Sequence, residues 1–366
     1  MGKKGFLIGL IMCALCLPVH AQYIGSGSSA FNFLGLPVSS RLNALGGSNV
    51  SIRDGELSMA MSNPALLGER THMVLNMNFC YLMEKTMFAS VMYGHNFGRS
   101  PIEKPFQGEG EPDKPNYFMA GIHYLDHGRM LYADENGRLT GGSFTAKDIV
   151  IHATYARQLG EMFSVGVTLK PVYSIYESYS AFALGADVGG HFQLKDSTLQ
   201  IGLVLQNIGW QLKGFYSREG GQSTQVLPLN LQLGISYHFK HAPIRLTMTI
   251  HNMQRWDLSY EDTNVPRSLT GETESTKISG IDMAFRHTIF AIDILPKSER
   301  FYITLSYNHR RRAEMNLKDQ RSLAGFAIGA GVRIYKFRLG FAISQLTKSN
   351  LTYQVGLSLD IRSMLK

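Results

Sequence analysis

The sequence predicts an all-β fold: a transmembrane antiparallel β-barrel of about 14 strands with an N-terminal plug segment. From about residue 72, segment after segment alternates apolar with polar residues, and most segments exceed the roughly 5–6 residues of a soluble-protein strand. Only 17% of the residues are charged and 44% are hydrophobic, whereas about 25% charge is usual in soluble proteins. This composition excludes a disordered chain, and no uncharged apolar run reaches the roughly 18 residues of a membrane-spanning helix. We therefore expect lipid to cover part of the surface.

The first element is an export signal over residues 1–21. Lys3 and Lys4 precede an apolar stretch that ends at Ala21, and this order is typical of a cleavable signal peptide. A lipoprotein signal would use Cys16, but the bulky residue before it disfavours that alternative. Cleavage after Ala21 removes two lysines, so the formal net charge falls from +8 to +6. It also leaves Cys80 without a partner for an intramolecular disulfide.

The second element, residues 22–71, does not alternate, and we interpret it as a plug segment. Gly46 and Gly47 permit a turn with positive φ or a close backbone approach. Asn63 can cap a short helix that has Pro64 at its first position, and Asp54 lies between the two motifs. An ordinary periplasmic extension is the alternative. Glycines on the predicted inner face of the barrel favour a plug because they leave room for it.

The third element, residues 72–366, is the barrel with a periplasmic C-terminal end. Strands of 9–11 residues tilted by about 45° cross a bilayer, and a closed antiparallel ribbon leaves no backbone group unpaired in lipid. A soluble sandwich or propeller would also alternate, but its strands are shorter and its outer face carries more charge. The predicted strands are 72–82, 86–95, 116–126, 147–159, 161–176, 180–193, 198–209, 226–240, 243–255, 279–291, 301–309, 322–334, 336–346 and 350–361.

The connections between these strands predict the orientation. Outer-membrane barrels have short periplasmic turns and longer extracellular loops. The predicted connections 127–146, 210–225, 256–278 and 310–321 are long and alternate with tight turns, which places the long ones outside the cell. Segment 96–115 breaks this alternation, since it would be a long periplasmic connection.

Two residue sets follow from this arrangement. The polar face of the strands places charges in the lumen, and we expect them to form a carboxylate–arginine network: Lys170, Asp187, Arg245, Asp282, Arg286, Arg333, Arg338 and Asp360. The long loops carry aromatic residues that either belong to an interfacial girdle or dock a partner: Tyr132, Phe144, Trp210, Phe215, Tyr216, Trp256 and Tyr260. They also carry arginines that either contact lipopolysaccharide or an acidic protein face, or remain solvated: Arg310, Arg311 and Arg312.

Catalytic motifs are missing from the sequence. It contains neither G-x-S-x-G nor H-E-x-x-H, its histidines are scattered without metal-ligand spacing, and its basic residues are too dispersed for nucleic acid. We expect neither an enzyme nor a cofactor or metal site. We therefore expect the function to depend on the loop surfaces of the barrel.

The motifs Ala44-Leu45-Gly46-Gly47, Asp54 and Asn63-Pro64-Ala65-Leu66-Leu67 resemble the FadL-like outer-membrane family, whose members place such a segment before a fourteen-stranded barrel. The run from Tyr124 to Gly128, the turn 134–137 and the runs 144–148 and 155–159 are similar to the PorQ branch of that family, which is related to PorV.

The resemblance implies an outer-membrane barrel of a Gram-negative bacterium that serves the type IX secretion system. Such a subunit would hold a PorZ-like surface protein in the attachment complex, beside a sortase-like protease with its barrel partner, through its extracellular loops. The alternative is a FadL-like channel for hydrophobic compounds. The predicted charged lumen departs from the apolar interior that this alternative requires.

Overall fold

A computed structural model describes residues 30–83, 86–97, 115–134, 136–215, 225–258, 278–296, 300–315, 323–346 and 350–364. The predicted signal peptide, residues 1–21, lies outside the described residues.

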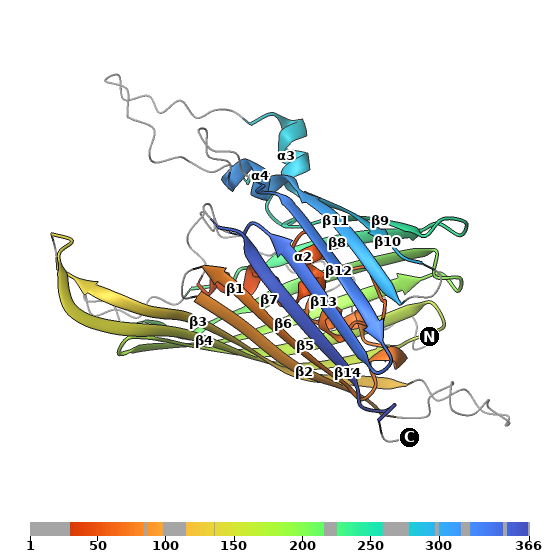
Figure 1. The fold of residues 1–366 in the computed structure, drawn as a ribbon, viewed down its shortest axis with the longest axis horizontal. Helices are drawn as coiled ribbons and strands as arrows, with labels where there is room; N and C mark the ends of the chain where they lie inside the picture. Colours follow the sequence, from red (N-terminus) through yellow and green to blue (C-terminus); the bar gives the residue numbers. More distant parts are fainter. Residues whose placement is uncertain are drawn as a thin grey trace, which may run out of the picture.

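Fourteen antiparallel strands form one closed barrel (Figure 1). Each strand pairs with its neighbours in the chain, and β1 pairs with β14 from Val74 opposite Asp360 to Tyr81 opposite Tyr353. Closure removes both sheet edges, which satisfies the backbone in lipid. The predicted fold class is confirmed.

The strand bounds are β1 Val74–Met83, β2 Thr86–Phe97, β3 Asn116–Ala133, β4 Leu139–Gln158, β5 Phe163–Tyr176, β6 Tyr179–Gln193, β7 Leu199–Lys213, β8 Asn230–His238, β9 Ile244–Ile250, β10 Thr288–Ile294, β11 Phe301–Asn308, β12 Phe326–Ile334, β13 Phe337–Ser344 and β14 Thr352–Asp360.

Period-two alternation separates the two faces of the wall. In β14, the side chains of Tyr353 and Val355 are 45% and 47% exposed on the outside, whereas Gln354 between them is fully buried inside. The other strands repeat this division, so a belt of aromatic and aliphatic side chains surrounds the barrel. Such a belt is what a bilayer solvates favourably.

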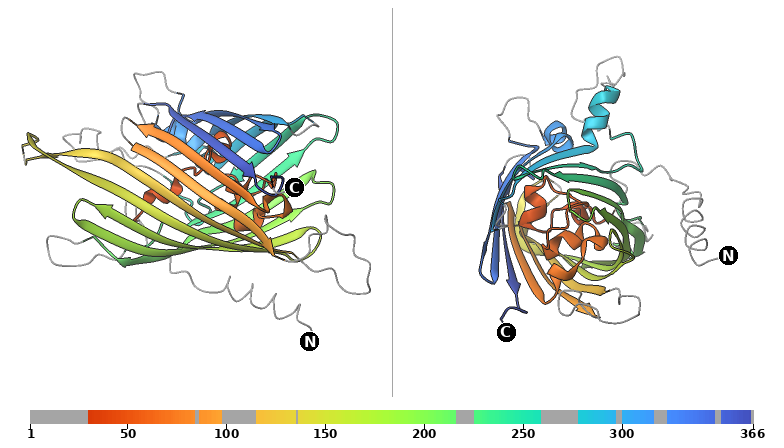
Figure 2. Two further views of the ribbon diagram at one scale, coloured as in Figure 1. Left: turned by 60° about the horizontal axis from the view of Figure 1, so that its bottom comes forward. Right: turned by 90° about the vertical axis from the view of Figure 1, so that its right-hand side faces the viewer.

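The two ends of the barrel differ. Short connections at one end join β4 to β5, β6 to β7, β8 to β9, β10 to β11 and β12 to β13, and the chain also leaves β14 at this end. At the opposite end the hairpin of β3 and β4 projects well beyond the other strands (Figures 1 and 2). Since periplasmic turns are the short ones, we call the first end the periplasmic end and the second the extracellular end.

One predicted strand is partly wrong. Residues 279–291 were expected to alternate as a strand, but Gly280–Arg286 form helix α3, and β10 begins only at Thr288. The apolar residues Ile281, Met283 and Phe285 fit period two, yet in the helix only Met283 is buried, where its sulfur accepts a hydrogen bond from the Leu258 backbone N–H at 3.3 Å. A second helix, α4 (His309–Met315), occupies the start of the predicted loop 310–321. Most of segment 96–115 lies outside the described residues.

The segment before the barrel lies inside it, as the end-on view in Figure 2 shows. It comprises short helices: η1 Asn32–Gly35, α2 Ser40–Ala44, η2 Leu57–Met61, η3 Pro64–Leu66 and η4 Glu69–Thr71. We call residues 31–71 the plug. No helix among the described residues has the length and apolarity needed to cross a bilayer.

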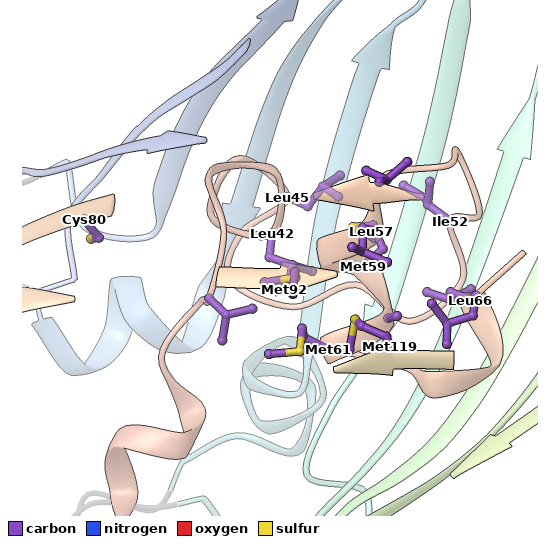
Figure 3. Packing of buried hydrophobic residues seen from close by; sticks show 14 of the residues in the cluster. Leu42, Leu45, Ile52, Leu57, Met59, Met61, Leu66, Cys80, Met92 and Met119 are labelled. Carbon is purple, nitrogen blue, oxygen red and sulfur yellow. The ribbon is translucent and has the colours of Figure 1, made fainter. Parts of the chain in front are cut away.

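An apolar cluster joins the plug to the wall (Figure 3). Leu42, Leu57 and Met59 of the plug belong to the same buried cluster as Met92 of β2 and Met119 of β3. Cys80 of β1 belongs to it too and is a buried free thiol. Burial of this kind of surface contributes roughly 25 cal/mol per Å² and holds the plug against β1–β3.

Candidate functional site

A buried ion network fixes the plug to the wall. The Arg41 side chain, 1% exposed, starts from α2 and donates to both carboxylate oxygens of Asp293 in β10, at 3.0 and 3.1 Å. Arg245 of β9 donates to the same carboxylate at 2.6 and 2.9 Å, and Thr304 donates at 2.5 Å. The fork of a guanidinium matches a carboxylate geometrically, so this arrangement orients Arg41 as well as neutralising it.

Local sequence places Arg41 at this position. Ser39 precedes α2, and its hydroxyl accepts the Leu42 N–H at 3.2 Å, a normal helix N-cap. After α2, Gly46 and Gly47 have φ values of 86° and 103°, which non-glycine residues rarely adopt. The cap and the glycine turn confine α2 to about one helical turn with Arg41 facing the wall.

Asp54 adds a second carboxylate from the plug itself. It lies 3.2 Å from Arg41 and 3.6 Å from Arg245. Burial alone would raise the pKa of Asp54, but these two guanidiniums hold the pKa below its usual range. Burial works against the charged form of Arg41, while Asp293 and Asp54 more than compensate and raise its pKa. The network is therefore ionised at neutral pH.

The Asn63-Pro64 motif anchors the opposite side of the plug. The buried Asn63 oxygen caps η3 by accepting the Ala65 N–H at 3.0 Å, and its amide donates to the carbonyls of Val50 at 2.8 Å and Gly190 at 3.2 Å. Glycines of the wall meet the plug here: Gly166 faces Pro64, Gly189 faces Asn63 and Gly202 faces the Val50 carbonyl. The prediction that inner-face glycines leave room for a plug is confirmed at these positions.

The glycine pair of the plug meets the extracellular end of the wall. A Cβ on Gly46 would lie 2.5 Å from the Ile289 side chain, and one on Gly47 would overlap the Arg311 guanidinium of α4. Burial, followed by the nearby Arg310, lowers the pKa of Arg311 to about 10. Arg311 thus packs onto the plug, and Arg310 is paired with Glu314 at 2.6 Å.

The predicted lumen charges divide into several groups. Lys170 and Asp187 form a buried pair at 2.5 Å, and Arg338 reaches Glu56 of the plug at 2.8 Å. Arg333 lies exposed at the periplasmic end, and Asp360 accepts the Ser363 N–H at 3.2 Å where β14 ends.

Two of the predicted lumen charges, Asp282 and Arg286, do not lie in the lumen. Both belong to α3, outside the barrel wall, where they pair with each other at 2.8 Å. His309 of α4 also contacts Asp282 at 2.7 Å, and these two hydrogen bonds lower the pKa of the carboxyl group. The prediction is wrong because it treated residues 279–291 as a strand.

Sequence reasoning missed Arg41, Glu56 and Asp293 as functional candidates. Asp293 follows the predicted end of its strand, and Phe290, Ile292 and Ile294 alternate in the opposite phase to Ile281, Met283 and Phe285. Extending the predicted strand would have placed Asp293 outside, whereas the alternation that begins at Phe290 places it on the inner face. No comparable signal exists for Arg41 and Glu56, whose charged partners in the wall, Asp293 and Arg338, come from the far end of the chain.

The predicted loop residues that the structure describes lie at the extracellular end, but Tyr132, Phe144 and Trp210 belong to strands β3, β4 and β7 and not to connections, because these strands run further than predicted. The rings of Tyr132 and Phe144 pack against each other on the projecting hairpin, with their centres 5.1 Å apart. Trp210 in β7 is 60% exposed. Trp256 is 64% exposed, and its ring stacks on that of His287 with the centres 5.2 Å apart. Phe215 stacks on Tyr176 at 4.9 Å. Arg312 belongs to α4. Tyr216 and Tyr260 lie outside the described residues.

An apolar patch lines the lumen above the plug, on the extracellular side. It consists of Phe31, Val150, Val172, Ala181, Ala183 and Leu227, with Phe33 and Phe215 packed against it. Beside it, Asp148 binds the Ser174 hydroxyl, His127 at 2.7 Å and the Tyr176 hydroxyl at 3.1 Å. Serine and histidine here contact the carboxylate rather than each other, so the cluster lacks the serine–histidine bond of a nucleophilic relay. Among the described residues, no three His, Cys, Asp or Glu side chains gather as metal ligands.

The scan against protein-family models finds no match for this chain, and no curated protein matches its sequence. Solved structures do match. The Pseudomonas putida toluene transporter TodX aligns with a TM-score of 0.51 and 12% identity, over 88% of this chain and 97% of that chain. The deltaS2 mutant of the TodX monoaromatic hydrocarbon channel aligns with a TM-score of 0.51 and 14% identity, over 90% and 98%.

The fold is that of a TodX-like outer-membrane barrel. The likeness extends along nearly the whole of the TodX chain. At 12–14% identity it concerns the path of the backbone.

Proposed function

We propose that this chain is a non-enzymatic docking subunit of the outer membrane, a plugged barrel that holds a surface protein at the extracellular end. One observation carries the proposal: the ion network of Arg41 and Asp293 ties the plug across the lumen, while uncovered apolar side chains gather at the extracellular end. The resemblance to PorQ-type subunits supplies the partner, a PorZ-like protein of the type IX attachment complex. A sortase-like protease and its barrel partner would complete that complex.

The projecting hairpin is the first docking surface. Leu131 is 56% exposed and Leu139 is 66% exposed, on a part of the hairpin that extends beyond the neighbouring strands (Figure 2). Tyr132 is held nearby, since its hydroxyl donates to Glu177 at 2.6 Å. Exposed apolar residues that gather beyond the wall are typical of a protein contact.

The helix pair α3–α4 is the second docking surface. Ile281 is 73% exposed and Phe285 is 46% exposed on α3. The contact of Asp282 with His309 joins the two helices, while the ion pair of Asp282 with Arg286 lies within α3. A rigid platform loses little conformational entropy when it binds a partner.

Replacing Leu131 and Leu139 by serine, and separately Ile281→Ser, tests docking. We expect the PorZ-like partner to move from the cell surface to the medium in at least one variant, while the barrel still folds and reaches the outer membrane. Tyr335→Ser is the matched control, because Tyr335 is 80% exposed in a turn at the periplasmic end. Retention of the partner by both docking variants would refute the proposal.

A second candidate function is a channel for small hydrophobic compounds. The TodX fold favours it more directly than it favours docking, and the apolar patch around Val172, which Phe31 of the plug covers, would contact such a compound once the plug residue moves aside. Val172 is fully buried, so Val172→Asp would place a charge in the patch, and Val172→Leu would keep it apolar. Uptake of labelled toluene into proteoliposomes that Val172→Asp abolishes and Val172→Leu retains would support the channel. No uptake by the unmodified protein would exclude it for toluene.

A further inference from the structure

A large cavity opens at the periplasmic end, below the plug. Its volume is about 1050 Å³, at the upper end of the roughly 300–1,000 Å³ usual for ligand sites. The plug and the ion network form its inner wall, through Arg41, Asp54 and Glu56, and the periplasmic ends of the strands form its sides. Neither the docking surfaces nor the apolar patch contributes to it.

The lining is strongly basic. Among the described residues that line the cavity, four are acidic, namely Asp54, Glu56, Glu69 and Glu161, and nine are Lys or Arg, namely Arg41, Arg53, Arg70, Lys195, Lys240, Arg245, Arg300, Arg333 and Arg338. Three of the four acidic residues already form ion pairs: Asp54 with Arg41 and Arg245, Glu56 with Arg338, and Glu161 with Lys195. Outside the lining, Asp293 pairs with Arg41 and Arg245, and Asp196 pairs with Lys240. Among the described residues, the positive charge that is left over in this concave site is therefore mainly that of Arg53, Arg300 and Arg333.

The excess concentrates on three neighbouring strands. Arg333 of β12 stands directly opposite Arg338 of β13 in the strand register, and both line the cavity. The Arg333 N–H donates to the Arg300 carbonyl at 2.6 Å, so Arg300 is the neighbour on the other side. Like charges directly across two strands destabilise a sheet. Glu56 pairs with Arg338, but within the described part of the chain neither Arg300 nor Arg333 makes an ion pair.

Arg53 adds a cation from the plug. Its guanidinium donates to the Leu67 carbonyl and lies 5.9 Å from the centre of the Tyr117 ring. Within the described residues it has no carboxylate within ion-pair distance. Burial lowers the pKa of Arg53, which is the sign of a cation held without a full counter-charge.

We propose that this cavity binds a phosphate-bearing ligand at Arg300 and Arg333, beside Arg338. A terminal phosphate carries about −1.5 to −2 charge and three acceptor oxygens, which suits a pair of guanidiniums better than a single carboxylate does. Glu56 already neutralises Arg338, so among the described residues the charge that remains at this edge is that of Arg300 and Arg333. The phosphate is either a free solute or the headgroup of a lipid.

Isothermal titration of the full-length mature protein in neutral detergent tests the proposal, with tripolyphosphate as the probe. We expect binding that weakens as salt rises, because exposed charge pairs are screened. The double variant Arg300→Gln/Arg333→Gln should weaken binding at least tenfold. Arg138→Gln, at the exposed tip of the β3–β4 hairpin, should bind as the unmodified protein does. Arg333→Lys keeps the positive charge but loses the guanidinium that can donate two parallel hydrogen bonds to a phosphate, so we expect an intermediate loss of affinity.

Two further probes identify the source of the phosphate. Binding of tripolyphosphate without binding of dihexanoyl phosphatidic acid supports a free solute, and tighter binding of the lipid supports a headgroup. Heat-modifiable gel mobility establishes that each variant is folded. The proposal is overturned if neither probe binds, if hexaglutamate binds more tightly than both, or if folded Arg300→Gln/Arg333→Gln binds as tightly as Arg138→Gln.

Discussion

The two sides of the barrel hold the same plug by partly different means. Strands β3–β7 are 14 to 20 residues long and meet the plug through glycines and the Asn63 amide. Strands β8–β14 are only 7 to 9 residues long. They also approach the plug through glycines, for example Gly329 beside Ala44, but in addition they hold it through Arg245, Asp293 and Arg338. Among the described residues, close packing thus fixes the plug on both sides, and the short side adds buried ion pairs. An added atom should disturb the packing and a lost partner should disturb the ion pairs, and each effect can be tested separately.

The largest effect is expected on the short side, from Asp293→Ala. The substitution leaves Arg41 and Arg245 buried without the carboxylate they share. Breaking a buried pair by removing one partner costs about 3–5 kcal/mol. The free energy of unfolding in urea, measured on protein refolded into detergent, should fall by that amount.

The control for this prediction is an exposed pair at the periplasmic turns. Asp196 lies 2.8 Å from Lys240, with side chains 46% and 60% exposed. We expect Lys240→Ala to leave the urea midpoint unchanged, because water screens such pairs, and this variant keeps the hydrogen bonds that Asp196 accepts from Thr198. Equal losses for Lys240→Ala and Asp293→Ala would mean that burial of the network adds nothing, and the comparison between the two sides would fail.

On the long side, neighbouring glycines in β6 provide a matched pair. A Cβ on Gly189 would overlap Asn63, whereas a Cβ on Gly190 would meet no atom within 4 Å. Overpacking costs about 1–3 kcal/mol, so Gly189→Ala should destabilise the barrel by that amount and Gly190→Ala should not. Limited proteolysis of the plug gives an independent measurement. Identical behaviour of the two variants would argue that the plug adapts to the wall on this side.

The smallest effect is expected on the pH dependence of the free energy of unfolding, through Asp54. Arg41 and Arg245 hold the pKa of Asp54 below its usual value of 3.8, against the effect of burial. A carboxyl group with a lowered folded-state pKa contributes stability above about pH 4, and this contribution is lost as pH falls through the folded-state pKa. Asp54→Asn should therefore lose on the order of 1 kcal/mol at pH 6 and less at pH 3. A pH profile parallel to that of the unmodified protein would contradict this assignment.

The wall was predictable from the sequence because apolar and polar residues alternate within each strand, and this alternation identifies the two faces of the strand. Tyr353 and Val355 opposite Gln354 are an example, since local alternation alone decides which side chain meets lipid. The same local signal failed at residues 280–286, where Ile281, Met283 and Phe285 fit both a strand and the helix that the structure contains. Alternation over seven residues is too short to separate the two.

The plug contacts were less predictable. Two features of the plug motifs were predicted from residue type and are present in the structure. Gly46 and Gly47 have positive φ, and Asn63 caps the helix η3. Their partners do not follow from local pattern, since Asp293 is 252 residues from Arg41 and Ser358 is 302 residues from Glu56. Only the register of the closed barrel brings such residues together.

The pairing of β1 with β14 has a consequence for biogenesis. The plug precedes the barrel in the sequence and is enclosed by a wall whose seam joins β1 to β14, so the plug must already be inside when the seam closes. Arg41 reaches its carboxylate only after β10 has formed, which leaves the plug loosely held through most of insertion. A folding catalyst in the membrane would have to keep the seam open long enough for the chain to enclose its own beginning.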